Sequence, residues 1–197
     1  MTRLVVLASG GGTNLQAILD ACADGRLPAE VAAVVSNRAG SGALQRAADA
    51  GVPYVHLAAH EGEPRADFDA RLADVVSGFD PDWVVLAGWM RVLSMSFLGW
   101  FPRMVVNLHP ALPGELPGVD SIAGAWREAQ QGRRDHTGVM IHLVPDEGID
   151  NGPVLATALV SIHPADSLES LTDRVHGVEH RLLVATLTTL CTTGANA

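Results

Sequence analysis

Two polar side chains stand at the end of a short apolar segment, where their types suit acyl-transfer chemistry. Asn107 and His109 follow residues 104–106, and three prolines and two glycines then end regular structure by residue 118. In an extended chain, residues two apart project to the same face. An amide N–H stabilises the oxyanion of a tetrahedral intermediate, and an imidazole gains or loses a proton near neutral pH. The pair predicts an acyl-transfer site at the carboxyl end of a buried strand.

A carboxylate close to the imidazole would complete such a site. It would set the tautomer of His109 and favour its charged form. Asp150 lies in a later loop that contains Gly148 and Gly152, so it is a candidate. Sequence spacing alone does not join it to His109, and a capping Asn107 beside a packed His109 is the alternative.

A glycine-rich turn over residues 10–14 reads Gly-Gly-Gly-Thr-Asn. At the start of a helix, the exposed N–H groups of such a turn suit a phosphate. The turn lacks the lysine of a P-loop, and Leu15 occupies the third glycine position of the dinucleotide fingerprint. It therefore predicts a monophosphate site, with a plain turn in which Thr13 caps the helix as the alternative.

Residues 36–38, Ser-Asn-Arg, follow the second apolar segment and offer no acidic residue for the ribose of NAD. An arginine there could hold the 2′-phosphate of NADP. An NADP-dependent reductase therefore stays open beside a solvated turn, and so does a nucleotide-binding protein without catalysis.

The remaining histidines carry less information. We expect His142 to be a packed, hydrogen-bonded side chain inside a strand. Thr172, His176 and Glu179 share one helix face and predict a solvated stripe, unless Glu179 reaches the hydroxyls of a ligand. No metal site is expected, because metal-ligand spacing is missing at His56, His60, His136 and His163.

The elements that must position these residues alternate between strand and helix. Apolar strand-like segments cover 3–8, 31–35, 53–57, 82–87, 104–106, 137–144 and 153–162. Helical patterns cover 15–24, 44–50, 68–77, 94–100, 122–131 and a long segment that opens with a capping box, Asp166 to Glu169. On that last helix, the residues expected to face inward are Leu168, Leu171, Val175, Val178 and Leu182. The alternation predicts an α/β fold with a doubly wound, mostly parallel sheet, whose ligands bind at the carboxyl ends of the strands.

Composition narrows the function. The chain has 197 residues and a net charge of −9, and all its basic residues are arginines, which excludes lysine chemistry and disfavours nucleic acid. No apolar run is long enough for a membrane span. Cys22 and Cys191 are expected to be free thiols in a reducing compartment. We expect a single cytoplasmic domain, 1–197, whose tail is frayed from about residue 192.

Taken together, five segments resemble the glycinamide ribonucleotide formyltransferase family, folate-dependent enzymes of purine synthesis. They are 9–14, 84–93, 107–110, 146–153 and 179–180, and they occur in the family's order across nearly the whole chain. The resemblance implies a Rossmann-like formyltransferase domain. It also implies transfer of the formyl group of 10-formyltetrahydrofolate, a co-substrate, to the amine of glycinamide ribonucleotide, which gives formylglycinamide ribonucleotide and tetrahydrofolate. No metal is implied, and a homodimer is compatible with it.

Family roles carry over to matching positions. Asn107, His109 and Asp150 would be catalytic. The phosphate and ribose of the ribonucleotide would contact Gly12, Thr13, Asn14, His176 and Glu179. The folate would contact Arg65, Met90, Arg91, Val92, Leu93, Asn107, Asp146, Glu147, Gly148, Ile149 and Asp150.

The chain departs from the family just after the catalytic histidine. Ala111-Leu-Pro-Gly114 stands where many relatives have Ser-Leu-Leu-Pro, and Glu115 stands where a basic residue is common. Formyltetrahydrofolate deformylases and methionyl-tRNA formyltransferases are similar to this domain but usually carry an extra N-terminal or C-terminal domain. We expect neither extra domain here.

Overall fold

One sheet of seven strands runs through residues 1–193, the part of the chain that the computed structural model describes. The strands are β1 (Thr2–Leu7), β2 (Ala29–Ser36), β3 (Tyr54–His56), β4 (Trp83–Leu86), β5 (Val105–His109), β6 (His136–Leu143) and β7 (Val154–Ser161). Their spatial order is β3-β2-β1-β4-β5-β6-β7. The first five are mutually parallel, and β6 and β7 join antiparallel. The predicted mostly parallel sheet is confirmed, with strand boundaries within two residues of expectation except at the end of β5, which extends three residues further, to His109.

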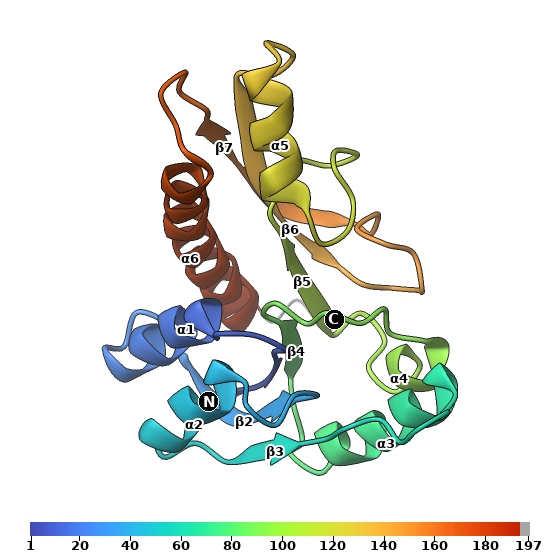
Figure 1. The fold of residues 1–197 in the computed structure, drawn as a ribbon. Coiled ribbons are helices and arrows are strands. Elements are labelled where there is room, and N and C mark those ends of the chain that lie inside the picture. Colours follow the sequence, from blue (N-terminus) through green and yellow to red (C-terminus); the bar gives the residue numbers. More distant parts are fainter. Residues whose placement is uncertain (194–197) are drawn as a thin grey trace.

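Helices cover both faces of this sheet (Figure 1). They are α1 (Thr13–Ala23), α2 (Gly42–Asp49), α3 (Arg65–Ser77), α4 (Met95–Leu98), α5 (Ser121–Gln130) and α6 (Leu168–Thr193). One apolar core lies between the sheet and α1, α2, α5 and α6, and a second lies against α3 and α4. Leu4 and Val6 of β1 belong to the first core, and Val5 and Leu7 to the second. This two-sided burial explains why β1 is apolar throughout rather than alternating.

The strand order reverses between β1 and β4. From β1 the chain proceeds outward to β2 and β3, and then returns to place β4 on the other side of β1. The loops at the carboxyl ends of β1 and β4 therefore diverge and leave a crevice between them. In open α/β sheets this is the place where ligands bind.

The predicted cap of α6 is wrong, and the alternative in which Thr13 caps α1 is not found. The residue before α1 is Gly12, whose φ of 75° is left-handed, and no side chain caps this helix, so Thr13 is simply its first residue. At the start of α6, Ser167 rather than Asp166 is the cap, because its Oγ accepts the N–H of Ser170 at 3.1 Å.

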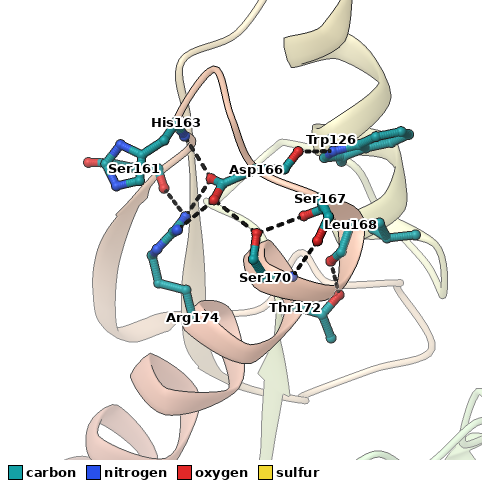
Figure 2. A network of polar contacts seen from close by, with 9 residues as sticks. All are labelled: Trp126, Ser161, His163, Asp166, Ser167, Leu168, Ser170, Thr172 and Arg174. Carbon is teal, nitrogen blue, oxygen red and sulfur yellow. Dashed lines mark hydrogen bonds and ion pairs between the residues drawn. The ribbon is translucent and has the colours of Figure 1, made fainter.

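Asp166 instead ties the start of α6 to its neighbours (Figure 2). Its carboxylate accepts hydrogen bonds from both terminal nitrogens of Arg174, each at 2.7 Å, and from the backbone N–H of His163 at 2.7 Å. Its carbonyl accepts the indole N–H of Trp126 at 3.0 Å. These bonds fix the first turns of α6 against β7 and α5, and they lower the pKa of Asp166 well below its ordinary value, chiefly through Arg174.

The buried face of α6 differs from the predicted one. Leu171 and Val175 are fully buried as expected, but Leu168 is 39% exposed and Leu183 is fully buried. Glu179 is also buried, so the predicted solvated stripe is wrong at that residue. Helix α6 extends to Thr193, and the rest of the tail that was expected to fray from about residue 192 lies outside the described residues.

Candidate active site

The carboxyl end of β5 carries Asn107 and His109 on one face of the sheet, as their spacing predicted. Asn107 is partly buried and His109 is 3% exposed. Asn107 lies between Leu86 of β4 and His142 of β6 in the strand register. Both side chains border a cavity of about 700 Å³ at the crevice between β1 and β4. That is the size of a small-molecule site.

Asp150 joins the pair through the loop between β6 and β7. Its Oδ2 lies 3.2 Å from Nδ1 of His109, and its Oδ1 accepts Nδ2 of Asn107 at 3.2 Å. The N–H of Gly118 donates to Oδ2 at 3.1 Å. Burial raises the pKa of Asp150, but His142, the Gly118 N–H and the charge of His109 outweigh it, and the pKa lies below its ordinary value. Asp150 is therefore a carboxylate at neutral pH.

His109 is enclosed by acceptors. Nδ1 faces Asp150, and Nε2 lies 3.1 Å from the carbonyl oxygen of Leu116. Carboxylate and carbonyl oxygens can accept hydrogen bonds but cannot donate them. Both contacts are therefore hydrogen bonds when each ring nitrogen of His109 carries a proton, and not otherwise. Burial nevertheless lowers the pKa of His109, against the raising influence of Asp150 and the backbone of Leu116 and Glu115. A buried imidazolium of lowered pKa gives up its proton readily, which suits proton transfer.

His142 belongs to this cluster, although the sequence indicated only a packed strand residue. Its Nδ1 lies 2.8 Å from the carbonyl of Leu143, so in the neutral ring Nδ1 donates and Nε2 accepts. Nε2 lies 3.0 Å from Nδ2 of Asn107. This contact orients the amide, and both N–H bonds of Asn107 are engaged, one by His142 and one by Asp150. Only the antiparallel register, which sets His142 opposite Asn107, reveals the contact.

The other end of the cavity is formed by the glycine-rich turn and α6. Gly10 to Asn14 line it together with His176 and Glu179. Nδ2 of Asn14 donates to Glu179 at 3.2 Å, and Arg46 donates to the carbonyl of Gly11 at 2.8 Å. Burial raises the pKa of Glu179, while the bond from Asn14 and the charge of His176 lower it less. This end combines backbone amides with polar side chains, as a phosphate and sugar require.

Most of the predicted folate contacts line the same cavity. Its lining includes Met90, Arg91, Val92 and Leu93 from the segment after β4, and Asp146, Gly148, Ile149 and Asp150 from the loop between β6 and β7. Arg65 and Glu147 are not among the residues that line it, and their folate contacts stay a prediction. They form an ion pair with each other, because Glu147 points from its loop toward α3 rather than into the cavity.

Comparison with known proteins decides the family. The model of the formyl transferase family matches residues 2–187. The chain belongs to the formyl transferase family.

This formyl transferase is similar along almost its whole length to several named relatives. The chain is 41% identical to the phosphoribosylglycinamide formyltransferase of Schizosaccharomyces pombe over 93% of this chain and 94% of that protein. The crystal structure of phosphoribosylglycinamide formyltransferase from Bacillus halodurans superposes with a TM-score of 0.91 at 36% identity, over 98% of this chain and 97% of that one. Glycinamide ribonucleotide transformylase 1 from Geobacillus kaustophilus gives 0.89 at 40% identity, over 96% and 98%.

The segment in which this formyl transferase departs from the expected pattern is internally satisfied. Ala111 is fully buried, and Glu115 forms an ion pair of 2.5 Å with Arg134, which also binds Glu128 at 2.8 Å. The side chain of Glu115 therefore has its own ion-pair partner.

Two further observations bear on alternatives. Arg38, the candidate for the 2′-phosphate of NADP, is not among the residues that line the cavity. Within residues 1–193, no cluster of three His, Cys, Asp or Glu side chains could hold a metal, and no helix is both long and apolar enough to span a membrane.

Proposed function

We propose that this chain transfers the formyl group of 10-formyltetrahydrofolate to the amine of glycinamide ribonucleotide, giving formylglycinamide ribonucleotide and tetrahydrofolate in de novo purine synthesis. The observation that carries the proposal is one cavity with a glycine-rich turn at one end and the Asn107, His109 and Asp150 cluster beside a hydrophobic wall. The relatives named as phosphoribosylglycinamide formyltransferases support the same reaction.

The two substrates approach the cluster from opposite sides. The N–H groups of Gly12, Thr13 and Asn14 hold the phosphate, and His176 and Glu179 contact the ribose side. The cavity wall of Met90, Arg91, Val92 and Leu93 takes the folate ring, faced by Asp146, Gly148, Ile149 and Asp150. The amine of the bound glycinamide ribonucleotide then lies next to the formyl carbon. Holding both substrates in this orientation makes the attack effectively unimolecular.

Asn107 and His109 act on the oxygen of the formyl group. When the neutral amine attacks, the carbonyl oxygen becomes an oxyanion, and a positioned donor stabilises it by about 3–4 kcal/mol. The oxyanion must replace one partner of Asn107, because both N–H bonds of that amide are engaged within the protein. Negative charge on the substrate also offsets the burial that lowers the pKa of His109, so the imidazolium forms as charge develops.

Asp150 supports this charged state, and the proton of the attacking amine leaves for the departing folate nitrogen through His109. The transfer is direct, since none of the cavity-lining residues among the described part of the chain is a serine or cysteine. Accumulation of a formyl-enzyme would contradict this mechanism.

The experiment mixes the protein with a 10-formylfolate analogue whose absorbance changes on loss of the formyl group, with and without glycinamide ribonucleotide. We expect change only when the ribonucleotide is present. An absorbance change without the ribonucleotide indicates a deformylase. Consumption of NADPH, when it is supplied to the protein, indicates a reductase. Asp150→Asn and Asn107→Ala should each lose about a hundredfold or more in kcat, and full activity in either would remove its role.

The proposal extends to a single formyltransferase unit in the cytoplasm, where the free Cys22 and Cys191 stay reduced. It also includes a homodimer. Light scattering after gel filtration tests the dimer, and a monomer at all concentrations would remove it.

A further inference from the structure

The loop between β6 and β7 is attached to the protein at two points. Asp150 is one, through Asn107, His109 and Gly118. The other is Glu147, whose Oε1 accepts the N–H of Met95 at 3.1 Å and whose Oε2 pairs with Arg65. Arg65 is the first residue of α3, and Met95 is the first residue of α4. The loop therefore spans from the catalytic cluster to the corner between α3 and α4.

That corner is anchored in the protein core. Asp69 of α3 is fully buried, and its Oδ2 accepts the N–H of Ser94 at 2.6 Å. Phe97 and Leu98 of α4 pack into the core beside Phe68. Two consecutive N–H groups, of Ser94 and Met95, are thus bound by carboxylates from α3 and from the loop. Glu147 therefore binds a segment that is itself attached to the core.

The backbone between the two attachments is constrained. Asp150 has a φ of 52°, a left-handed conformation that costs a non-glycine residue free energy and persists only where neighbours impose it. The N–H of Gly148 donates to Asp146 at 2.8 Å, which tightens the turn that contains Glu147. Only two residues lie between Glu147 and Asp150, which limits the distance between their Cα atoms to about 10 Å, so movement of Glu147 is transmitted to Asp150.

We propose that Glu147 is a positioning residue, which, held by Arg65 and the Met95 N–H, keeps Asp150 in line with His109 and Asn107. The inference rests on the proposed function in that Asp150 is taken as catalytic. It adds a role within the protein to the folate contact that the family resemblance implied for Arg65 and Glu147. Neither side chain lines the cavity, so their effect on the reaction passes through the loop.

The test compares Glu147→Ala, which removes both contacts, with Glu147→Gln, which keeps an acceptor for Met95. Glu30→Gln is the matched control, because Glu30 pairs with Arg3 at 2.5 Å with similar exposure of the two side chains, 38% and 46%, against 46% and 41% for Arg65 and Glu147. We expect Glu147→Ala to lose about tenfold in kcat, Glu147→Gln less, and Glu30→Gln nothing.

A double-mutant cycle separates positioning from general destabilisation. If Glu147 acts through Asp150, Glu147→Ala should leave the single-turnover rate of Asp150→Asn unchanged. An equal loss in both backgrounds, or a loss equal to that of Glu30→Gln, would overturn the proposal.

Amide hydrogen exchange makes the test independent of activity. Exchange at residues 148–151 should be faster in Glu147→Ala than in wild type and in Glu30→Gln. Unchanged exchange would refute the attachment itself, whereas faster exchange in a protein without formyltransferase activity would refute the proposed function and leave the attachment standing.

Discussion

Replacing Gly12 with alanine tests how closely the glycine-rich turn packs against α2. Gly12 has a φ of 75°, and a Cβ built there would lie 2.8 Å from Cα and 3.0 Å from Cβ of Ala43. The left-handed conformation costs an alanine about 1–2 kcal/mol. Overpacking against a helix backbone typically adds about 1–3 kcal/mol. The free energy of unfolding should therefore fall by about 2–5 kcal/mol.

Gly25 provides the control, because it has the same conformation without the contact. Its φ is 79°, and a Cβ there would have no neighbour within 4 Å. Gly25→Ala should cost only the conformational part, about 1–2 kcal/mol. The difference between the two variants isolates the contact with α2.

Urea unfolding of wild type and both variants measures these free energies, and steady-state kinetics adds the functional part. Gly12 ends the turn assigned to the phosphate, so Gly12→Ala should raise KM for glycinamide ribonucleotide more than it lowers kcat, whereas Gly25→Ala should change neither. Equal losses of stability in the two variants would refute the close packing. An unchanged KM in a folded Gly12→Ala would refute the phosphate assignment.

Three further changes test other parts of the structure. His142→Ala removes the acceptor that orients Asn107 and should lower kcat about tenfold with little change in KM. Steady-state kinetics measures both constants, and a change in KM as large as the change in kcat would contradict this role. Burial raises the pKa of Glu179 in the folded protein above its value in the unfolded chain. The protonated form therefore favours folding, and this stability is fully present below the unfolded pKa and is lost as the pH rises through the folded pKa. Glu179→Gln should therefore raise the free energy of unfolding in urea at pH 8 and leave it nearly unchanged at pH 4, and the reverse pattern would contradict that direction. Leu183→Ala, at a fully buried position of α6, should cost about 2–5 kcal/mol in the same assay, and a loss below 1 kcal/mol would show that the site collapses.

The sequence alone was sufficient for the fold and for the strand-end pair. Apolar segments separated by helical patterns predicted the alternating fold, because strands covered on both faces show no polar alternation. Asn107 and His109 were placed on one face because strand geometry has a period of two residues. The glycine-rich turn was recognised because glycines and a following helix are local in sequence.

The sequence could not place groups that meet only across the fold. His142 looked like a packed residue until β6 paired with β5 and set it opposite Asn107. Glu179 looked solvated on its helix until α6 packed beside α1, where Asn14 binds it. The separation of Arg65 and Glu147 from the cavity depends on the direction in which one loop side chain points, which no local pattern records.

For this protein, then, local periodicity and turn chemistry determined which strands form and which polar residues stand at their ends. Residue spacing could not join Asp150 to His109, and only the family resemblance suggested it; the tertiary structure brings them together, because antiparallel pairing of distant segments carries the loop of Asp150 to β5. It also decided the protonation preferences of His109 and Glu179. Burial and the acceptors around a side chain set its pKa, and both are properties of the packed molecule.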